Sequence, residues 1–405
     1  MTAAALSSQS QAGSQLARPF ALACLALCVG QAVFLAAAFV KGTWLLDPSG
    51  RAIATDFVNV WAAGRQALAG APAAVYDVAL QKAAEVAAVG HGFEGEFPWV
   101  YPPAYLFVAV LLALLPQVAA CAAWLALTFP AYVAVIRAIV GRREGIVLAC
   151  AYPGLLANAV VGQNGFASAA LLGGALLLME RSPIAAGCLV GLISCKPHLG
   201  ILLPIVLVAG GHWRVFASAA AVVVLLALAA WAAFGIDTWV AFFHSLSSAS
   251  QSTLEQGRAD WAKLQSLYGL VRMAGGSSAF AWAMQGMLAA AVAASLVALW
   301  RSKTSFDLKA AALATGALLA TPYVFLYDLV VLAVAMAFLL RANAKDGPVP
   351  GELAGLAVAG LLILGFPLLK APVGLAAALV VALLVARRAG LLRSKAAAGR
   401  RPAQA

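Results

Sequence analysis

Charged residues are scarce in this chain of 405 residues. Asp, Glu, Lys and Arg make up 10% of it and hydrophobic residues 64%, with a mean hydropathy of +0.95. Soluble domains carry about 25% charged residues, so a soluble fold is excluded. Apolar segments near membrane length recur along the chain, and each approaches the ~30 Å of a bilayer core. Because lipid offers no partner to an unpaired backbone group, we predict an all-α, polytopic integral membrane protein with about 10–12 transmembrane helices.

Three further patterns are missing. The net charge is +11, but no basic stripe is interleaved with aromatic residues, so nucleic-acid binding is excluded. The bases instead gather at segment ends and in the C-terminal tail, as the positive-inside rule and contact with anionic lipid headgroups predict. The six cysteines show no disulfide or metal spacing, and His91, His212 and His244 show no zinc spacing. We therefore expect no metal-ligating residues and no cofactor, and the sequence leaves a divalent-metal requirement open. No internal repeat suggests a transporter built of inverted halves.

The domain organisation follows from the apolar and polar intervals. We expect a disordered tail over 1–19, a single transmembrane domain over 20–388 and a basic cytoplasmic tail over 389–405. The first span, near 20–40, is longer than the ~7–15-residue core of a signal peptide, so we treat it as uncleaved. With Arg18 inside, this span exits to the non-cytoplasmic face.

Two polar intervals, 41–103 and 236–278, then become external loops. Within the first loop, apolar residues at helical spacing predict an interfacial amphipathic helix from about 56 to 69 and a second helix from about 77 to 89. The region 104–140 stays ambiguous. Its length suits two spans, whereas the alternation of charged ends requires an odd number of crossings.

Asp56 is the first candidate functional residue, because it follows soon after the first span leaves the membrane. One interpretation is a helix cap, formed by Thr55 or Asp56. The other is a catalytic base that takes a proton from an incoming hydroxyl, and a helix N-terminus would favour its charged form. The two interpretations are compatible.

Lys196 is the second candidate, since it stands in an otherwise apolar region of the sequence, within GLISCKPHLG. Ionisable residues in membrane segments are costly and usually functional. Lys196 is either a phosphate contact, with His198 as a second donor, or a lysine that snorkels to the interface at a helix break. Gln163 and Asn164, between two glycines, form either a polar hairpin turn or hydrogen bonds to sugar hydroxyls or phosphate.

The third candidate cluster follows Pro322, which breaks a helix. Asp328 falls inside the next span, where a buried carboxylate needs a partner. That partner is Lys196, Tyr323 or Tyr327, and a purely structural ion pair is the alternative. In the first loop, Tyr101 and Arg65 are assigned to the acceptor side, although an aromatic at this level also serves as an interfacial anchor.

The order of these motifs resembles glycosyltransferase family 87, which includes polyprenol-phosphate-mannose-dependent mannosyltransferases of bacteria. The resemblance covers roughly residues 20–340 and rests on motifs in a fixed order. The motifs are Gly64 to Gly70 with Val75-Tyr76-Asp77, Tyr101-Pro102-Pro103, Gly162-Gln163-Asn164, Gly187 to Lys196-Pro197, Thr321-Pro322-Tyr323 and Tyr327-Asp328.

The resemblance implies a GT-C fold, a polyprenyl-phosphate-sugar donor, inverting transfer and a site on the periplasmic side of a bacterial inner membrane. It maps the family's loop aspartate onto Asp56, and its Gln and Lys onto Gln163 and Lys196. Many relatives carry a histidine near the last motif, where this chain has Tyr323 and Asp328. This departure concerns the contact to the donor phosphate and the identity of the sugar.

We therefore expect a membrane glycosyltransferase that moves mannose or another hexose or pentose to a lipid or glycan acceptor. Its partners would be membrane lipids, the lipid-linked sugar and the acceptor. The alternative is a transporter or lipid-linked-sugar flippase with Asp56, Lys196 and Asp328 along a pathway. The long external loop, which a carrier does not need, and the missing repeat count against it. A non-catalytic assembly protein is the weakest alternative, because intact charged residues in the membrane would be unexpected there.

Overall fold

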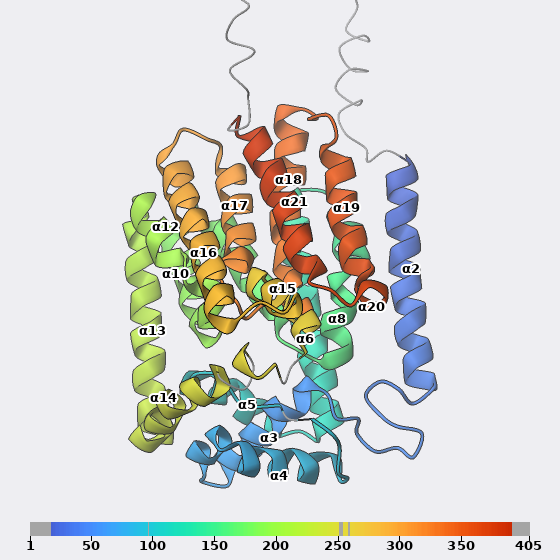
Figure 1. Ribbon diagram of the computed structural model, residues 1–405, viewed down its shortest axis with the longest axis vertical. Helices are drawn as coiled ribbons and strands as arrows, with labels where there is room; N and C mark the ends of the chain where they lie inside the picture. Colours follow the sequence, from blue (N-terminus) through green and yellow to red (C-terminus); the bar gives the residue numbers. More distant parts are fainter. Residues whose placement is uncertain (1–17, 96, 251–253, 258–259, 391–405) are drawn as a thin grey trace, which may run out of the picture.

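The computed structural model describes residues 18–95, 97–250, 254–257 and 260–390. Its described residues are almost entirely helical, with isolated β-bridges at Trp44, Leu46 and Ala52 as the sole extended pairing among them. A bundle of roughly upright helices stands on a lower layer of shorter helices that lie across it (Figure 1). The predicted all-helical, polytopic architecture is confirmed. Most of the predicted tails lies outside the described residues.

Within the described part of the chain, five helices are long and apolar enough to cross a membrane. They are α2 (Arg18–Val40), α6 (Gln117–Val140), α13 (Trp213–Phe234), α16 (Ser278–Arg301) and α18 (Val330–Asp346), the last with the 3₁₀ turn η6 (Leu326–Leu329) that precedes it. A sixth candidate consists of α7 (Glu144–Ala151) and α8 (Gly154–Val161), which bend by 64° at their junction. Pro153 stands at this bend, where its ring is incompatible with a continuous helix.

The remaining helices of the bundle are shorter. They are α9 (Gly165–Leu178), α10 (Pro183–Leu192) with η3 (Ile193–Cys195), α11 (Pro197–Gly200), α12 (Leu203–Ala209), α17 (Phe306–Leu319), α19 (Glu352–Leu364), α20 (Phe366–Leu369) and α21 (Val373–Arg388). Breaks at Gly162, Lys196 and Pro322 divide the apolar sequence into these pieces. The figure of 10–12 spans stays a prediction, because length and composition alone identify five or six.

The first loop forms most of the lower layer. It contains α3 (Asp56–Leu68), η1 (Pro72–Tyr76), α4 (Val78–Val89) and η2 (Pro103–Tyr105). Both helices predicted in this loop are present. In the ambiguous region 104–140, α5 (Leu106–Ala113) is short and packs against α3, and α6 has the length of a span. The number of crossings there stays a prediction.

The second polar interval is largely helical as well. It forms α14 (Ile236–Ser250), η5 (Trp261–Lys263) and α15 (Leu267–Met273). Helix α14 packs against η1 of the first loop, and η5 and α15 lie where the bundle meets the lower layer (Figure 1). The two polar intervals therefore gather at the same end of the bundle.

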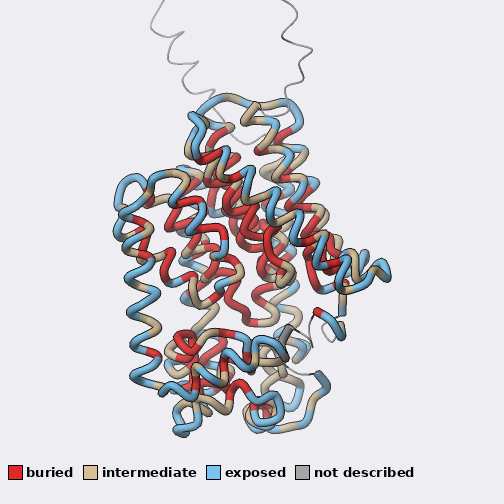
Figure 2. The backbone as a smooth tube through the Cα atoms, turned by 60° about the vertical axis from the view of Figure 1, so that its left-hand side comes forward, coloured by how far each residue is buried: buried red, intermediate tan, exposed pale blue. Residues whose placement is uncertain are grey.

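The buried core runs through the centre of the bundle, while outer helices such as α13 are mostly exposed along their length (Figure 2). Helix α18 is buried over much of its length and packs against α6, α9 and α17. Exposed apolar residues on the outer helices are what lipid contact requires.

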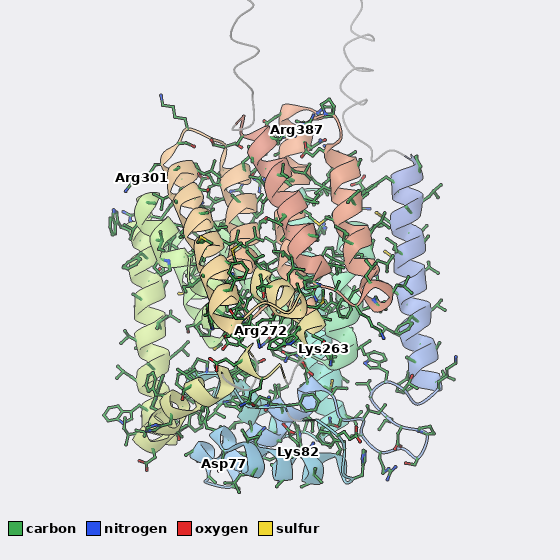
Figure 3. The ribbon with its side chains drawn as sticks, viewed as in Figure 1. Asp77, Lys82, Lys263, Arg272, Arg301 and Arg387 are labelled. Carbon is green, nitrogen blue, oxygen red and sulfur yellow. The ribbon has the colours of Figure 1, made fainter. Side chains whose placement is uncertain are left out.

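Charges collect at the end of the bundle away from the lower layer. Arg301 and Arg387 lie there, whereas Asp77 and Lys82 lie in the lower layer (Figure 3). Two buried acids are paired at this end, Asp307 with Arg341 and Lys345, and Glu352 with the buried Arg388. This distribution agrees with a basic face opposite the two polar intervals.

The contact between α3 and α5 generates the first prediction. A Cβ on Gly64 would overlap the Ala109 carbonyl oxygen. Gly64→Ala must therefore push α3 away from α5, and we expect a loss of about 1–3 kcal/mol, seen as a lower thermal unfolding midpoint in detergent. Gly92→Ala, whose Cβ would meet open space, is the control. Equal midpoints for the two variants would contradict this packing.

Candidate functional site

Asp56 is the first residue of α3, directly after the N-cap residue Thr55. Thr55 makes no side-chain capping bond. The Asp56 carboxylate accepts a hydrogen bond from Gln163 Nε2 at 3.4 Å, so it faces the bundle instead of closing its own helix. The residue is partly exposed. Burial of the carboxylate raises the pKa of Asp56, and the Gln163 hydrogen bond and the charges of Lys263 and Lys196 act in the opposite direction.

Gln163 and Asn164 lie in the turn between α8 and α9, and both are buried. Gln163 Oε1 accepts hydrogen bonds from the Tyr101 hydroxyl at 3.1 Å and from the Asn164 backbone N–H at 3.0 Å. Asn164 Nδ2 donates to the Tyr101 hydroxyl at 3.2 Å. Tyr101 therefore links both amides, which fixes their orientation next to Asp56.

The sequence around this turn explains its shape. Gly162 ends α8 with φ +70°, a conformation in which a side chain is strained. Asn158 Oδ1 accepts from the Gly165 backbone N–H at 2.7 Å. A Cβ on Gly165 would overlap the Tyr327 carbonyl oxygen. The glycines thus allow the turn to pack directly against the backbone of the segment that carries Asp328.

Lys196 occupies the break between η3 and α11. Its ammonium donates to Asn164 Oδ1 at 2.6 Å and pairs with Asp328 Oδ1. The side chain is 8% exposed, so it does not snorkel to the interface. A lysine ammonium has three N–H donors, and two are used by these partners. The third is available to a substrate oxygen.

Asp328 is 1% exposed and lies in η6. Its second oxygen accepts from the Phe325 backbone N–H at 3.0 Å. The ion pair that the sequence allowed between Asp328 and Lys196 is therefore formed. The Lys196 ammonium also lies 5.1 Å from the centre of the Tyr327 ring, which stacks on Phe325 at 5.6 Å.

These contacts form one continuous chain of polar groups. It runs from Asp56 through Gln163, Asn164 and Lys196 to Asp328. Its members come from segments that are far apart in the sequence, and they meet where the lower layer carrying α3 joins the bundle (Figure 1).

Three further predicted site residues lie on segments next to this polar chain or in the first loop. His198 lies in α11 next to Lys196, and its buried Nε2 has no hydrogen-bond partner among the described residues. Tyr323 packs against the cluster that contains Leu264 and Tyr268. Arg65 is exposed, with its guanidinium 5.7 Å from the centre of the Trp61 ring. The roles assigned to these three residues stay predictions.

The structure adds Lys263 and Asn158, which sequence reasoning did not assign to the site, and it gives Tyr327 contacts beyond its predicted pairing with Asp328. Tyr327 is partly exposed and lies near the Asp56 carboxylate and beside the Lys196 ammonium. Lys263, in η5, is exposed and stands near enough to influence Asp56 (Figure 3). Buried Asn158 holds the 162–165 turn. A lone Asn in an apolar helix is a sequence signal for the role of Asn158. The positions of Tyr327 and Lys263 near Asp56 depend on tertiary contacts, which the sequence does not show.

The described residues contain no group of three or more His, Cys, Asp or Glu side chains that would hold a metal ion. The site chemistry that these residues offer is therefore a carboxylate, amide donors and acceptors, and ammonium groups. Such a set can accept a proton from a hydroxyl and bind an anionic group.

The buried Lys196–Asp328 pair generates the second prediction. Replacing one partner leaves an uncompensated buried charge, so Lys196→Met should cost about 3–5 kcal/mol. We expect a lower thermal unfolding midpoint in detergent. The double variant Lys196→Met/Asp328→Leu removes both charges and should recover most of this loss. A single variant as stable as the original chain would show that the pair is not formed.

One comparison with known proteins identifies a family for this chain. The family model of glycosyltransferase family 87 matches residues 99–322, which is more than half of the chain. The match includes Tyr101, Gln163, Asn164 and Lys196, while Asp56 and Asp328 lie outside it. No curated protein and no solved structure matches the chain. The chain belongs to glycosyltransferase family 87 and is therefore a membrane glycosyltransferase.

Proposed function

We propose that this enzyme transfers a sugar from a polyprenyl-phosphate donor to a hydroxyl of a lipid or glycan acceptor, with inversion and with Asp56 as the general base. The observation that carries this proposal is the polar chain from Asp56 to Asp328. It brings one partly exposed carboxylate and one buried ammonium into the same site, at the end of the bundle where the polar intervals gather.

The reaction is a single displacement. The acceptor oxygen attacks the anomeric carbon and forms the new glycosidic bond. The bond between that carbon and the phosphate oxygen breaks, and the polyprenyl phosphate leaves with the electron pair. The hydroxyl proton goes to the Asp56 carboxylate, so charge and atoms balance.

The positive charges of the site are complementary to the negative charge of the departing polyprenyl phosphate. The third N–H of Lys196 can donate to a phosphate oxygen, and preorganised donors stabilise the charge that develops there. Lys263, exposed in η5, is placed to add a second positive charge. Tyr327 offers a ring beside the same ammonium.

Inversion is supported by the state of the second carboxylate. A retaining mechanism requires a carboxylate that attacks the sugar and forms a covalent intermediate. Asp328 is unsuited to this role, because one of its oxygens pairs with Lys196 and the other accepts from the Phe325 N–H. With Asp56 as the base, the site then has no second carboxylate to act as the nucleophile of a retaining mechanism.

The location of the site supports a periplasmic orientation. Arg301 and Arg387 lie at the end of the bundle opposite α3 (Figure 3). If the positive-inside rule holds, that end is cytoplasmic and Asp56 faces the periplasm. A donor and an acceptor that are both membrane-associated would meet at this interface.

Asp56→Asn tests the assignment of the base. The amide keeps the shape of the side chain but cannot take the proton, so we expect transfer to fall by about 10²–10⁴-fold. A deletion strain complemented with each variant, followed by mass spectrometry of its envelope glycolipids, identifies the product and reports its loss. The purified enzyme then gives the rate. Asp47→Asn, in the same loop, is the matched control. Undiminished transfer by Asp56→Asn would refute the proposal.

The pH dependence of kcat/KM gives a separate prediction. The base must be ionised, so activity is lost as pH falls through the pKa of Asp56. Burial raises this pKa, and the acid limb should therefore lie above the ~3.9 of an ordinary Asp. The charge of Lys263 lowers the same pKa, so Lys263→Gln should move the limb to higher pH. Lys303→Gln is the matched control, and an equal shift in both variants would contradict the assignment.

A further inference from the structure

An apolar cavity lies on the side of the bundle that α2 covers, and its lining residue Tyr152 reaches the backbone next to Asp328. It has a volume of about 240 Å³ and is lined by α2, α6, α7, α18 and α19. Among the described residues, its lining contains no charged side chain. The hydroxyl of Tyr152, a lining residue, donates to the Leu329 carbonyl oxygen and is thereby satisfied. An apolar cavity of this kind does not retain water, so it favours an apolar occupant.

The cavity exists because α2 meets the bundle along only part of its length. Gln31 Nε2 donates to the Cys150 carbonyl oxygen at 3.0 Å, and the Cys28 thiol donates to the Val147 carbonyl oxygen at 3.4 Å. These bonds hold the middle of α2 against α7. The first half, from Phe20 to Leu27, lines the cavity instead, over roughly 10 Å of helix.

The cavity opens to the outside of the bundle along α19. Leu361 and Leu364, which line it, are 63% and 41% exposed. In a bilayer these residues face lipid, and an unfilled cavity would forfeit the dispersion contacts of its walls. A lipid chain can therefore enter from the side.

Basic residues surround the upper end of the cavity. Val140, the last residue of α6, lines it and is followed by Arg142 and Arg143. Arg387 lies at the same end of the bundle (Figure 3), and its guanidinium lies beside Gly351, the N-cap of α19. The buried acid Glu352 is already paired with Arg388. The other acids at these helix ends are Glu144 and Asp346. The four arginines Arg142, Arg143, Arg387 and Arg388 therefore outnumber the three acids, and the positive balance is complementary to an anionic headgroup.

The basic end of this cavity lies far from the proposed base Asp56. Cys121, near the start of α6, packs with Phe57, the neighbour of Asp56. Val140 lies 19 residues further along the same helix, roughly 28 Å away. A donor whose phosphate meets Lys196 would leave the basic opening without a headgroup.

We propose that the cavity between α2 and the α18–α19 pair binds one acyl chain of an anionic phospholipid, with its headgroup at Arg143 and Arg387. The bound chain fills the gap that α2 leaves and completes the packing of this helix on the bundle. The site takes a structural lipid, independently of the transfer reaction.

Gly360→Leu is the sharpest test. Gly360 lines the cavity, and the nearest atom to a Cβ built on it is Pro153 Cγ at 4.0 Å. The leucine side chain therefore fills the cavity without displacing the backbone. The full-length protein, delipidated in detergent, is incubated with phosphatidylglycerol and examined by native mass spectrometry. We expect one phosphatidylglycerol on the original chain and its loss in Gly360→Leu.

Two glycines on outer surfaces supply matched controls. Gly30 on α2 and Gly286 on α16 are exposed, and a Cβ added to either would have no neighbouring atom within 4 Å. Gly30→Leu and Gly286→Leu should retain the lipid. Ala357→Leu, a second cavity-filling variant, guards against a folding defect specific to residue 360, and the thermal unfolding midpoint reports folding of every variant.

The headgroup is tested separately by comparing phosphatidylglycerol with phosphatidylcholine. Each arginine near a headgroup contributes about 1 kcal/mol, so Arg143→Gln/Arg387→Gln should reduce the preference for phosphatidylglycerol by roughly thirtyfold. Retention of the lipid by folded Gly360→Leu and Ala357→Leu would overturn the proposal. Equal binding of both phospholipids by the original chain would also overturn it. So would a structure in which a polyprenyl phosphate or the chain's own N-terminal segment occupies this cavity.

Discussion

The ion pair between Lys196 and Asp328 is the constraint on which the site depends. Both side chains are buried in an apolar bundle, where a single charge is too costly to remain unpaired. Their pairing requires the break before α11 and the 3₁₀ turn η6 to lie side by side. It also leaves Lys196 with one donor beyond Asn164 and Asp328. The same contact thus neutralises the buried charges of Lys196 and Asp328 and leaves one N–H of Lys196 for a substrate.

The interruptions of the helices serve this contact. Irregular backbone at membrane depth is tolerated where it is enclosed by protein or lines a cavity. Here Gly162, Lys196 and the segment after Pro322 interrupt three apolar stretches, and the interruptions converge. The 162–165 turn packs against the Tyr327 backbone because Gly165 has no side chain. The lower layer then places Asp56 against Gln163. The basic end of the bundle, where the apolar cavity opens, is the region for which we propose phospholipid binding.

Much of this architecture is predictable from the sequence, because lipid restricts the chain to helices and the charge scarcity identifies the spans. The helices at 56–68 and 78–89 follow from their apolar spacing. Asp56, Gln163, Lys196 and Asp328 stand out as polar residues in apolar or otherwise sparse surroundings. The length of each helix does not follow, since breaks within apolar runs shorten several of them. The positions of Lys263 and of the Tyr327 ring in the site follow only from tertiary contacts. Tertiary packing also places Tyr323 against the cluster that contains Leu264 and Tyr268.

The central claim is that one site holds the base and the phosphate-binding ammonium. A structure of the enzyme with a non-hydrolysable polyprenyl-phosphonate sugar tests it most directly. The account predicts a phosphonate oxygen within hydrogen-bonding distance of Lys196 Nζ, with the anomeric carbon turned toward Asp56. A phosphonate bound away from Lys196, or a sugar whose anomeric carbon lies on the far side of the bundle from Asp56, would contradict it.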